Sequence, residues 1–191
     1  MPPICLRLER DIMKRVIQII GAGLICGSVF AADFVSGPKV GAALPKLTVE
    51  AVTGPDEGKK LDYTTTRKDQ PTIYVFIQAA EWGRPTARYL RALDQEAGKL
   101  KALVVAVWLT AEPDKTKDYL PKAQQSLKFE STALTFFRGE KEGPEDWGLS
   151  DRAFVTTVIS TKGKVASTFG YQSLNETDVP LVKEALVKAL K

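Results

Sequence analysis

The chain has 191 residues, of which 44% are hydrophobic and 26% are charged, a balance typical of one globular domain rather than of a disordered or fibrous chain. It contains 27 Lys and Arg against 23 Asp and Glu, and it has no His. Because these charges nearly cancel and no basic cluster is interleaved with aromatic residues, we expect no nucleic-acid partner.

Residues 1–31 are predicted to be a secretory signal peptide. If translation starts at Met13 rather than at Met1, a Lys-Arg pair is followed by an apolar segment over 16–29 and by a small-residue cleavage signal. The glycine-interrupted apolar segment is shorter than the ~20 residues that span a bilayer, so a cleaved signal is preferred to a membrane anchor. Lipid attachment at Cys26 is a further alternative, although the residues before it fit a lipobox poorly. We expect an exported protein, periplasmic or secreted, with no membrane span after cleavage.

Cleavage after Ala31 would leave a chain without sulfur. Cys5 and Cys26 are the only cysteines, and Met1 and Met13 are the only methionines. Because His is also absent, the remaining chain cannot support thiolate catalysis, imidazole acid–base catalysis, disulfides or zinc sites with nitrogen or sulfur ligands. We therefore expect no metal and no cofactor.

The first part of the exported chain predicts an edge region and a central strand. Residues 32–45 are rich in Gly, Ala and Pro and are predicted to be an extended lead-in to one domain over 46–191. Residues 47–52 alternate as in a half-buried strand, and residues 54–60 form a turn cluster. Residues 72–78 are β-branched and aromatic with little alternation, which predicts a strand buried on both faces at the centre of the sheet.

The elements that follow predict two βαβ units. Pro85 suits the first turn of a helix, and the apolar residues after it have helical spacing. A second continuous apolar strand, over 102–109, comes before another helix that opens at residues 114–116. Tyr119 is predicted to lie on the apolar side of that helix. Strands and helices that alternate with short links favour a parallel arrangement.

The pattern then changes to an antiparallel one. A short strand is predicted over 133–137, and strands over 154–160 and 165–169 flank a Lys-Gly turn typical of a β-hairpin. A Thr-Asp cap at 177–178 begins a closing amphipathic helix that extends over 181–190. The predicted fold is mixed α/β.

Three motifs resemble the thioredoxin-like superfamily. Residues 80–86, A-E-W-G-R-P-T, resemble its A-E-W-C-G-P-C motif at a strand-to-helix junction. Residues 147–159 resemble its aromatic-Gly-Val…Ile-Pro-Thr-Thr run, and residues 44–61 resemble the opening of peroxiredoxin-like redoxins, the alkyl hydroperoxide reductase and thiol-specific antioxidant type. The motifs cover about residues 40–191 with consistent spacing. The resemblance implies a three-layer α/β/α sandwich with a central mixed sheet.

The departures from the family pattern concern its active site. The resemblance places the two family cysteines at Gly83 and Thr86 and the family cis-proline at Val155. Gly83 has nothing to ionise at a helix N-terminus that would stabilise a thiolate. Thr86 has no His to act as its base, and a trans bond is expected before Val155. We therefore expect neither thiol-disulfide exchange nor peroxidase activity, and assign no catalytic residue.

A binding face is predicted where the family has its concave substrate face. It comprises Trp82, Arg84, Pro85 and Trp147, and a protein or peptide in the cell envelope is the expected partner. The alternative is that Trp82 and Pro85 only pack the first helical turn, and that Arg84 is a solvated surface residue.

Two further hypotheses concern function. Glu145 and Asp146 beside Trp147, together with Glu81 and Arg84, would form a hydrolase-type site if they shared a pocket that raised a carboxyl pKa. Their loop lacks the spaced Asp/Asn-Gly pattern of a calcium loop. The other hypothesis is a degenerate domain that serves only as a structural scaffold.

Overall fold

The computed structural model describes residues 35–139 and 143–191, whose elements belong to one compact unit, Ala32–Lys191. The predicted signal peptide lies outside the described residues. Within the described ranges, no helix combines the length and apolarity that a bilayer crossing requires.

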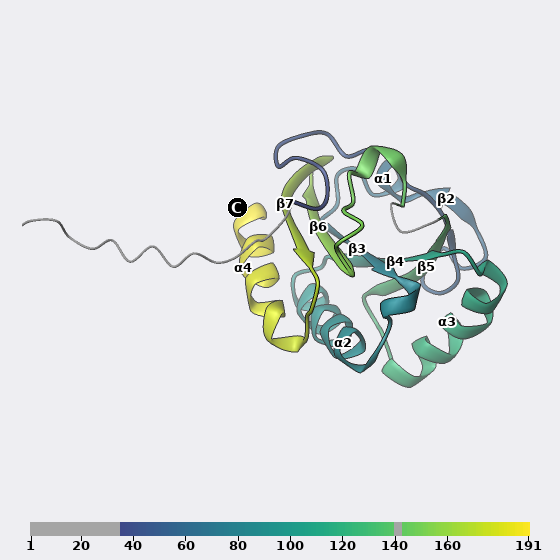
Figure 1. The fold of residues 1–191 in the computed structure, drawn as a ribbon. Helices are drawn as coiled ribbons and strands as arrows, with labels where there is room; N and C mark the ends of the chain where they lie inside the picture. The colour runs from purple at the N-terminus through teal and green to yellow at the C-terminus, as the bar shows by residue number, and fades with distance from the viewer. Residues whose placement is uncertain (1–34, 140–142) are drawn as a thin grey trace, which may run out of the picture. The chain divides into compact units, whose positions relative to one another are not determined.

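Seven strands form one mixed sheet (Figure 1). They are β1 (Thr48–Ala51), β2 (Lys60–Asp62), β3 (Thr72–Gln78), β4 (Leu103–Thr110), β5 (Thr132–Arg138), β6 (Val155–Thr161) and β7 (Lys164–Tyr171). The order across the sheet is β2-β1-β5-β4-β3-β6-β7. Strands β3, β4 and β5 are parallel, whereas the other pairs are antiparallel. The prediction of parallel units followed by an antiparallel hairpin is confirmed.

Strand β3 lies at the centre of this sheet, between β4 and β6, and all seven of its residues are buried. Ile73, Val75 and Ile77 contribute to the core on one face of the sheet, and Tyr74 and Phe76 contribute to the core on the other. This alternation follows from the two-residue period of a strand. The prediction of a strand buried on both faces is confirmed.

Three helices cover the first of these faces: α2 (Arg84–Lys99), α3 (Pro113–Leu127) and α4 (Val179–Ala189) (Figure 1). The connections from β3 through α2 to β4, and from β4 through α3 to β5, step in the same direction along the sheet. Right-handed crossovers of this kind place α2 and α3 on one face. Each of the three helices has a proline in its first turn, where the missing N–H costs no hydrogen bond.

The second face is covered mostly by irregular segments. They are the lead-in, the one-turn helix α1 (Tyr63–Thr66) and the 3-10 turn η2 (Glu145–Trp147). Trp147 is fully buried, with its ring centroid 5.3 Å from that of Tyr74 and 4.7 Å from that of Phe76. The predicted α/β/α class is confirmed, with α1 as the helix of this thinner layer.

Strand β2 and helix α1 were not predicted, because polar side chains rather than apolar periodicity define them. The Asp62 carboxylate accepts hydrogen bonds from the backbone N–H of Thr64 at 3.1 Å and from that of Leu47 at 3.0 Å. It therefore caps α1 and also holds the start of β1 beside it. Residue 60, placed in the predicted turn cluster, begins β2.

The lead-in forms a short bridge with the sheet edge. Ala43 pairs with Lys164, and the N–H of Gly41 donates to the carbonyl of Val165 at 2.8 Å. These contacts cover the first residues of the edge strand β7. The described part of the lead-in contains bends and a turn between residues 37 and 42, and its backbone is part of the fold.

Asp94 connects α2 to the segment before β5. Its side chain is buried, and its carboxylate accepts hydrogen bonds from the N–H groups of Glu130 at 3.2 Å and Ser131 at 2.8 Å, and from the Thr132 hydroxyl at 2.7 Å. One acid therefore satisfies three donors at the point where the chain enters β5.

We predict that Asp94→Ala lowers the free energy of unfolding by about 2–4 kcal/mol, because it leaves buried donors without an acceptor. Urea denaturation measures this difference. Asp118→Ala, at an exposed position of α3, is the matched control and should change stability little. Equal urea concentrations at the unfolding midpoints of the two variants would contradict the role assigned to Asp94.

Candidate functional site

The predicted motif at residues 80–86 lies where the carboxyl end of β3 meets α2. The 3-10 turn η1 (Ala79–Glu81) follows β3 directly, and Gly83 is the N-cap of α2. In parallel α/β sheets, ligands bind outside the carboxyl ends of the strands. The strand-to-helix junction predicted from the sequence is therefore at the edge where a ligand site is expected.

Gly83 has a backbone that any residue can adopt. Its φ of −155° and ψ of −174° are extended, and a Cβ added there would meet only the Pro85 Cδ, at 3.7 Å. Its carbonyl accepts a hydrogen bond from the Ala87 N–H at 2.9 Å. The position leaves room for a side chain, yet it carries none and has no ionisable group.

Thr86 is buried in the first turn of α2, and its hydroxyl lies 3.4 Å from the carbonyl oxygen of Glu81. A carbonyl oxygen accepts a hydrogen bond but is no general base, so this contact does not activate the hydroxyl as a nucleophile. Tyr89 follows on the next turn, and burial raises the pKa of its phenol well above the usual value. It stays neutral, so it provides no base here either.

Val155 is buried at the start of β6, and the described residues contain no cis peptide bond. The preceding residue, Phe154, donates its N–H to the carbonyl of Tyr171 at 2.8 Å and accepts from the N–H of Gln78 at 3.1 Å. Both backbone groups of Phe154 are therefore used inside the sheet. An incoming chain finds no free backbone pair at this residue.

Trp147 does not lie on a surface. Its side chain is fully buried, and its indole Nε1 donates a hydrogen bond to the carbonyl of Lys46 at 3.1 Å. This corrects the prediction that Trp147 contributes to a binding face, because a core side chain cannot contact a partner.

Trp82 is half-buried, and it both packs against the protein and lines a pocket. Its ring centroid lies 4.8 Å from that of Trp108 on β4, and its Nε1 donates to the Tyr119 hydroxyl at 2.7 Å. Tyr119 is 44% exposed, so the expectation that it lies on the buried side of its helix is wrong. The Trp82–Tyr119 hydrogen bond joins the segment before α2 to helix α3.

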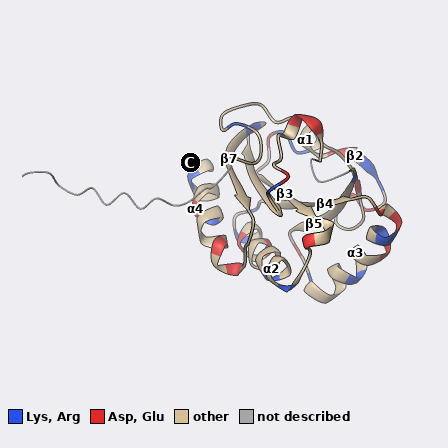
Figure 2. Cartoon of the chain, in the orientation of Figure 1, with Lys and Arg blue, Asp and Glu red and all other residues tan. Residues whose placement is uncertain are grey.

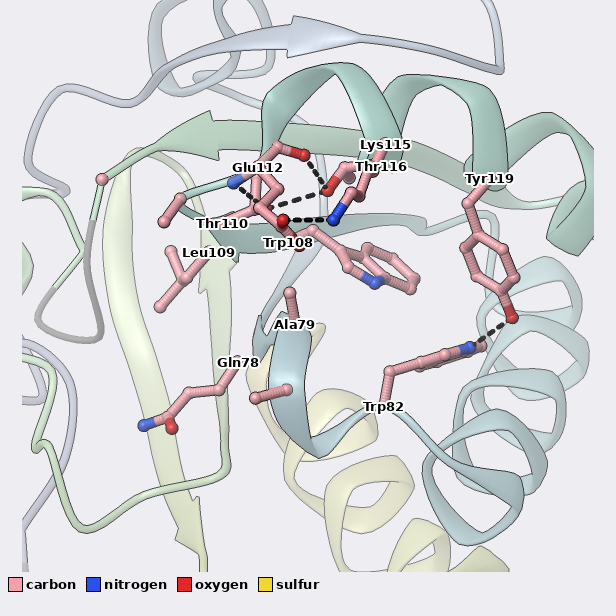
Figure 3. Close-up of a pocket in the computed structure, with 13 residues that line it drawn as sticks. Gln78, Ala79, Trp82, Trp108, Leu109, Thr110, Glu112, Lys115, Thr116 and Tyr119 are labelled. Atoms are coloured by element: carbon pink, nitrogen blue, oxygen red, sulfur yellow. Dashed lines mark hydrogen bonds and ion pairs between the residues drawn. The ribbon is translucent and has the colours of Figure 1, made fainter.

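A pocket of about 620 Å³ opens between η1, the end of β4 and the first turns of α3 (Figure 3). Its aromatic side is formed by Trp82, Trp108 and Tyr119. This volume is within the usual range of small-ligand sites, and such sites are typically lined by apolar and aromatic side chains.

The polar side of this pocket is internally paired. The Thr110 hydroxyl accepts hydrogen bonds from the Glu112 N–H at 3.0 Å and from the Thr116 hydroxyl at 2.9 Å. Glu112 also forms an ion pair with Lys115, and Figure 3 shows these contacts along one wall. Because these groups satisfy one another, the aromatic side is the part of the pocket that is free to contact a ligand.

The other predicted site residues do not line this pocket. Arg84 lies in a separate groove between α2 and α3. Glu81 is exposed on η1, whereas Glu145 and Asp146 are exposed on η2, the turn that carries Trp147 into the core of the second face. The structure therefore brings these three carboxylates into neither the pocket nor the groove. In the described ranges no three side chains of His, Cys, Asp or Glu gather as a possible metal site.

The sequence patterns did not identify Trp108, Thr110 or Glu112 as site residues. Trp108 and Thr110 end a strand whose apolar run indicates only burial. A usable signal was the parallel arrangement itself, since it places the ends of β3 and β4, at Gln78 and Thr110, on one edge.

Comparison with known proteins shows a likeness in fold. No family model and no curated protein matches the chain. A thiol peroxidase from Chromobacterium violaceum matches with a TM-score of 0.57 at 12% identity, covering 81% of this chain and 89% of its own. A peroxidoxin from Mycobacterium tuberculosis matches with a TM-score of 0.55 at 16% identity, covering 78% and 97%. A secreted thiol-disulfide isomerase from Corynebacterium glutamicum matches with a TM-score of 0.57 at 15% identity, covering 76% and 85%. The chain has a thioredoxin-like fold, as its motifs implied.

We predict that Gly83→Ser raises the free energy of unfolding by about 0.5 kcal/mol, because Ser is a favoured N-cap and the backbone is extended here. The matched control is Gly54→Ser. Gly54 has a φ of +97°, and an added Cβ would lie 2.9 Å from that of Ala133, so we expect a loss of about 2 kcal/mol or more. Thermal or urea unfolding measures the stability of both variants. Equal losses of stability would contradict the prediction and would show that the backbone at residue 83 requires glycine.

Proposed function

We propose that this chain is an exported thioredoxin-like domain that performs no thiol chemistry and binds a protein or peptide partner. The observation that carries this proposal is the contrast at the head of α2. Gly83 and Thr86 offer no nucleophile where the family resemblance places sulfur, while an open pocket of about 620 Å³ adjoins them.

The absence of sulfur chemistry is supported by sequence and site together. Both cysteines, Cys5 and Cys26, lie in the predicted signal peptide. The Thr86 hydroxyl contacts a carbonyl rather than a base. Export is supported by the signal-peptide pattern and by two structural neighbours described as a secreted isomerase and as a pneumococcal exposed lipoprotein thioredoxin.

The pocket favours capture of a side chain. Because the backbone groups of Phe154 are paired inside the sheet, a partner gains no strand pairing there. The accessible parts of Trp82 and Tyr119 instead provide an aromatic surface against which an aromatic or aliphatic side chain can pack, and the buried Trp108 ring supports Trp82.

The hydrolase hypothesis has no such support. Glu81, Glu145 and Asp146 line neither the pocket nor the α2–α3 groove, so neither of these two cavities brings them together. The scaffold hypothesis differs from ours in one measurable respect, since a pure scaffold would capture no partner.

We predict that neither the full chain nor its Cys5→Ser/Cys26→Ser variant reduces insulin or consumes peroxide above the buffer blank. The reason is that thiol turnover needs a thiolate, and the site has no group that could become one. Turnover by the cysteine-free variant would refute the redox-inactive assignment. If the full chain showed turnover and the cysteine-free variant did not, the activity would be assigned to Cys5 or Cys26.

We predict that Trp82→Ala weakens capture of an envelope partner by about tenfold, because buried aromatic anchors dominate interface energies. Co-purification from an envelope fraction, quantified against the wild-type chain, gives the measurement. Leu181→Ala removes an exposed apolar side chain from α4 and is the control. If the two variants capture the same proteins in the same amounts, the pocket is not the contact surface.

A further inference from the structure

A second hollow surface runs between helices α2 and α3, outside the pocket described above. It consists of two adjoining hollows of about 470 and 510 Å³, both lined by Leu127. We call this surface the α2–α3 groove. Its small or apolar residues are Ala87, Ala123 and Leu127.

Basic side chains line both hollows. Arg84 of α2 and Lys122 of α3 line the first hollow. Arg91 of α2 and Lys128, the residue that follows α3, line the second together with Lys99, which pairs with Glu96. Figure 2 shows Lys and Arg on both helices. A helix rises 1.5 Å per residue, so Arg84 and Arg91 are separated by about 10 Å along α2, and Lys122 and Lys128 by about 9 Å.

These four cations are not neutralised by ion pairs. None of the six ion pairs found among the described residues includes Arg84, Arg91, Lys122 or Lys128. Arg88, on the same helix, behaves differently, because it pairs with Glu176 at 3.2 Å. These four cations of the groove therefore have no acidic partner within the described part of the chain.

Carboxylates offset only part of this charge. The first hollow contains no Asp or Glu. The second contains Asp94 and Glu130 beside Arg91, Lys99 and Lys128, and the hydrogen bonds that Asp94 accepts leave its negative charge in place. The groove thus carries an excess of positive charge that is concentrated at the Arg84 end.

We propose that the α2–α3 groove binds an extended acidic peptide whose carboxylates are three residues apart. One carboxylate contacts Arg84 and Lys122, and the other contacts Arg91 and Lys128. A peptide in the polyproline II conformation has three residues per turn and rises about 3.1 Å per residue, so acidic residues at positions i and i+3 lie on one face about 9 Å apart, close to the separation of the cation pairs. The apolar floor between the two cation pairs accommodates the intervening residues, and opposite charges across the interface provide specificity.

A peptide fits these observations better than nucleic acid does. The exported chain is nearly balanced in charge, and the basic surface is limited to two pairs in one groove. A nucleic-acid strand requires a longer basic track than these cations provide. The inference does not depend on the proposed function, because the four cations line the groove and not the pocket, although Trp82 and Tyr119 border both surfaces.

The test uses the full chain and fluorescein-labelled peptides at about 0.15 M ionic strength. Pro-Pro-Glu-Pro-Pro-Glu-Pro-Pro holds two Glu three residues apart in an extended polyproline helix that rises about 3.1 Å per residue. The comparison peptides have adjacent Glu residues, or Gln in place of both. Fluorescence anisotropy should give an affinity for the spaced peptide about fivefold higher than for the adjacent one, and no binding of the Gln peptide.

Charge reversal locates the binding surface. Arg84→Glu/Lys122→Glu should weaken binding of the spaced peptide by about tenfold or more, whereas Lys117→Glu, an exposed position of α3 outside the groove, should not. Circular dichroism confirms that each variant is folded. Binding of the Gln peptide, unchanged affinity of the groove variant, or tighter binding of single-stranded RNA to the same groove would each overturn the proposal. The proposed function is tested by partner capture with Trp82→Ala, whereas the groove is tested by peptide binding. A negative result in the first experiment therefore leaves the second unaffected.

Discussion

The burial of β3 on both faces is the constraint on which the rest of the structure depends. Its five apolar residues alternate between two cores, and its neighbours β4 and β6 occupy both of its hydrogen-bonding edges. Such a strand cannot shift its register by one residue without exchanging Ile73, Val75 and Ile77 for Tyr74 and Phe76. The carboxyl end of β3 therefore has one position, and both η1 and the start of α2 are placed by it.

The N-terminus of α2 lies at this position and has no ionisable nucleophile at Gly83 or Thr86. At the start of α2, Gly83 is extended and Thr86 is buried, and neither has an ionisable side chain. Trp82 connects this helix start to β4 through ring packing with Trp108 and to α3 through a hydrogen bond to Tyr119. The polar groups at the start of α3 satisfy one another. The described residues at this edge include no Cys or His, and they form a partly aromatic surface.

Sequence patterns predicted the parts of the fold that rest on periodicity. The bounds of β3 agree with the apolar run over 72–78, and the long helices begin at their prolines. Periodicity does not distinguish the buried side of a helix from its border, so Tyr119 was placed on the apolar side of its helix although it is exposed. Trp147 was misassigned for the opposite reason, since its polar loop gave no sign that the indole enters the core.

The sequence predicted where the site lies, but it did not predict which residues line it. The motif at residues 80–86 correctly marked the junction, but pocket residues such as Trp108 and Thr110 come from the next strand, where nothing in the local sequence separates a pocket wall from a core residue. The α2–α3 groove was harder still, because Arg84 and Lys122 are far apart in sequence and become neighbours only when two crossovers place their helices on the same face.

The Trp82–Tyr119 hydrogen bond has a geometric consequence for anything that occupies both surfaces. Trp82 and Tyr119 line the pocket on one side and the first hollow of the groove on the other, so this pair forms a low ridge between two compartments. A single ligand that crosses this ridge and binds one surface would hold its second contact group near the other surface at a high effective concentration. Two weak contacts would then give a combined affinity higher than that of either contact alone.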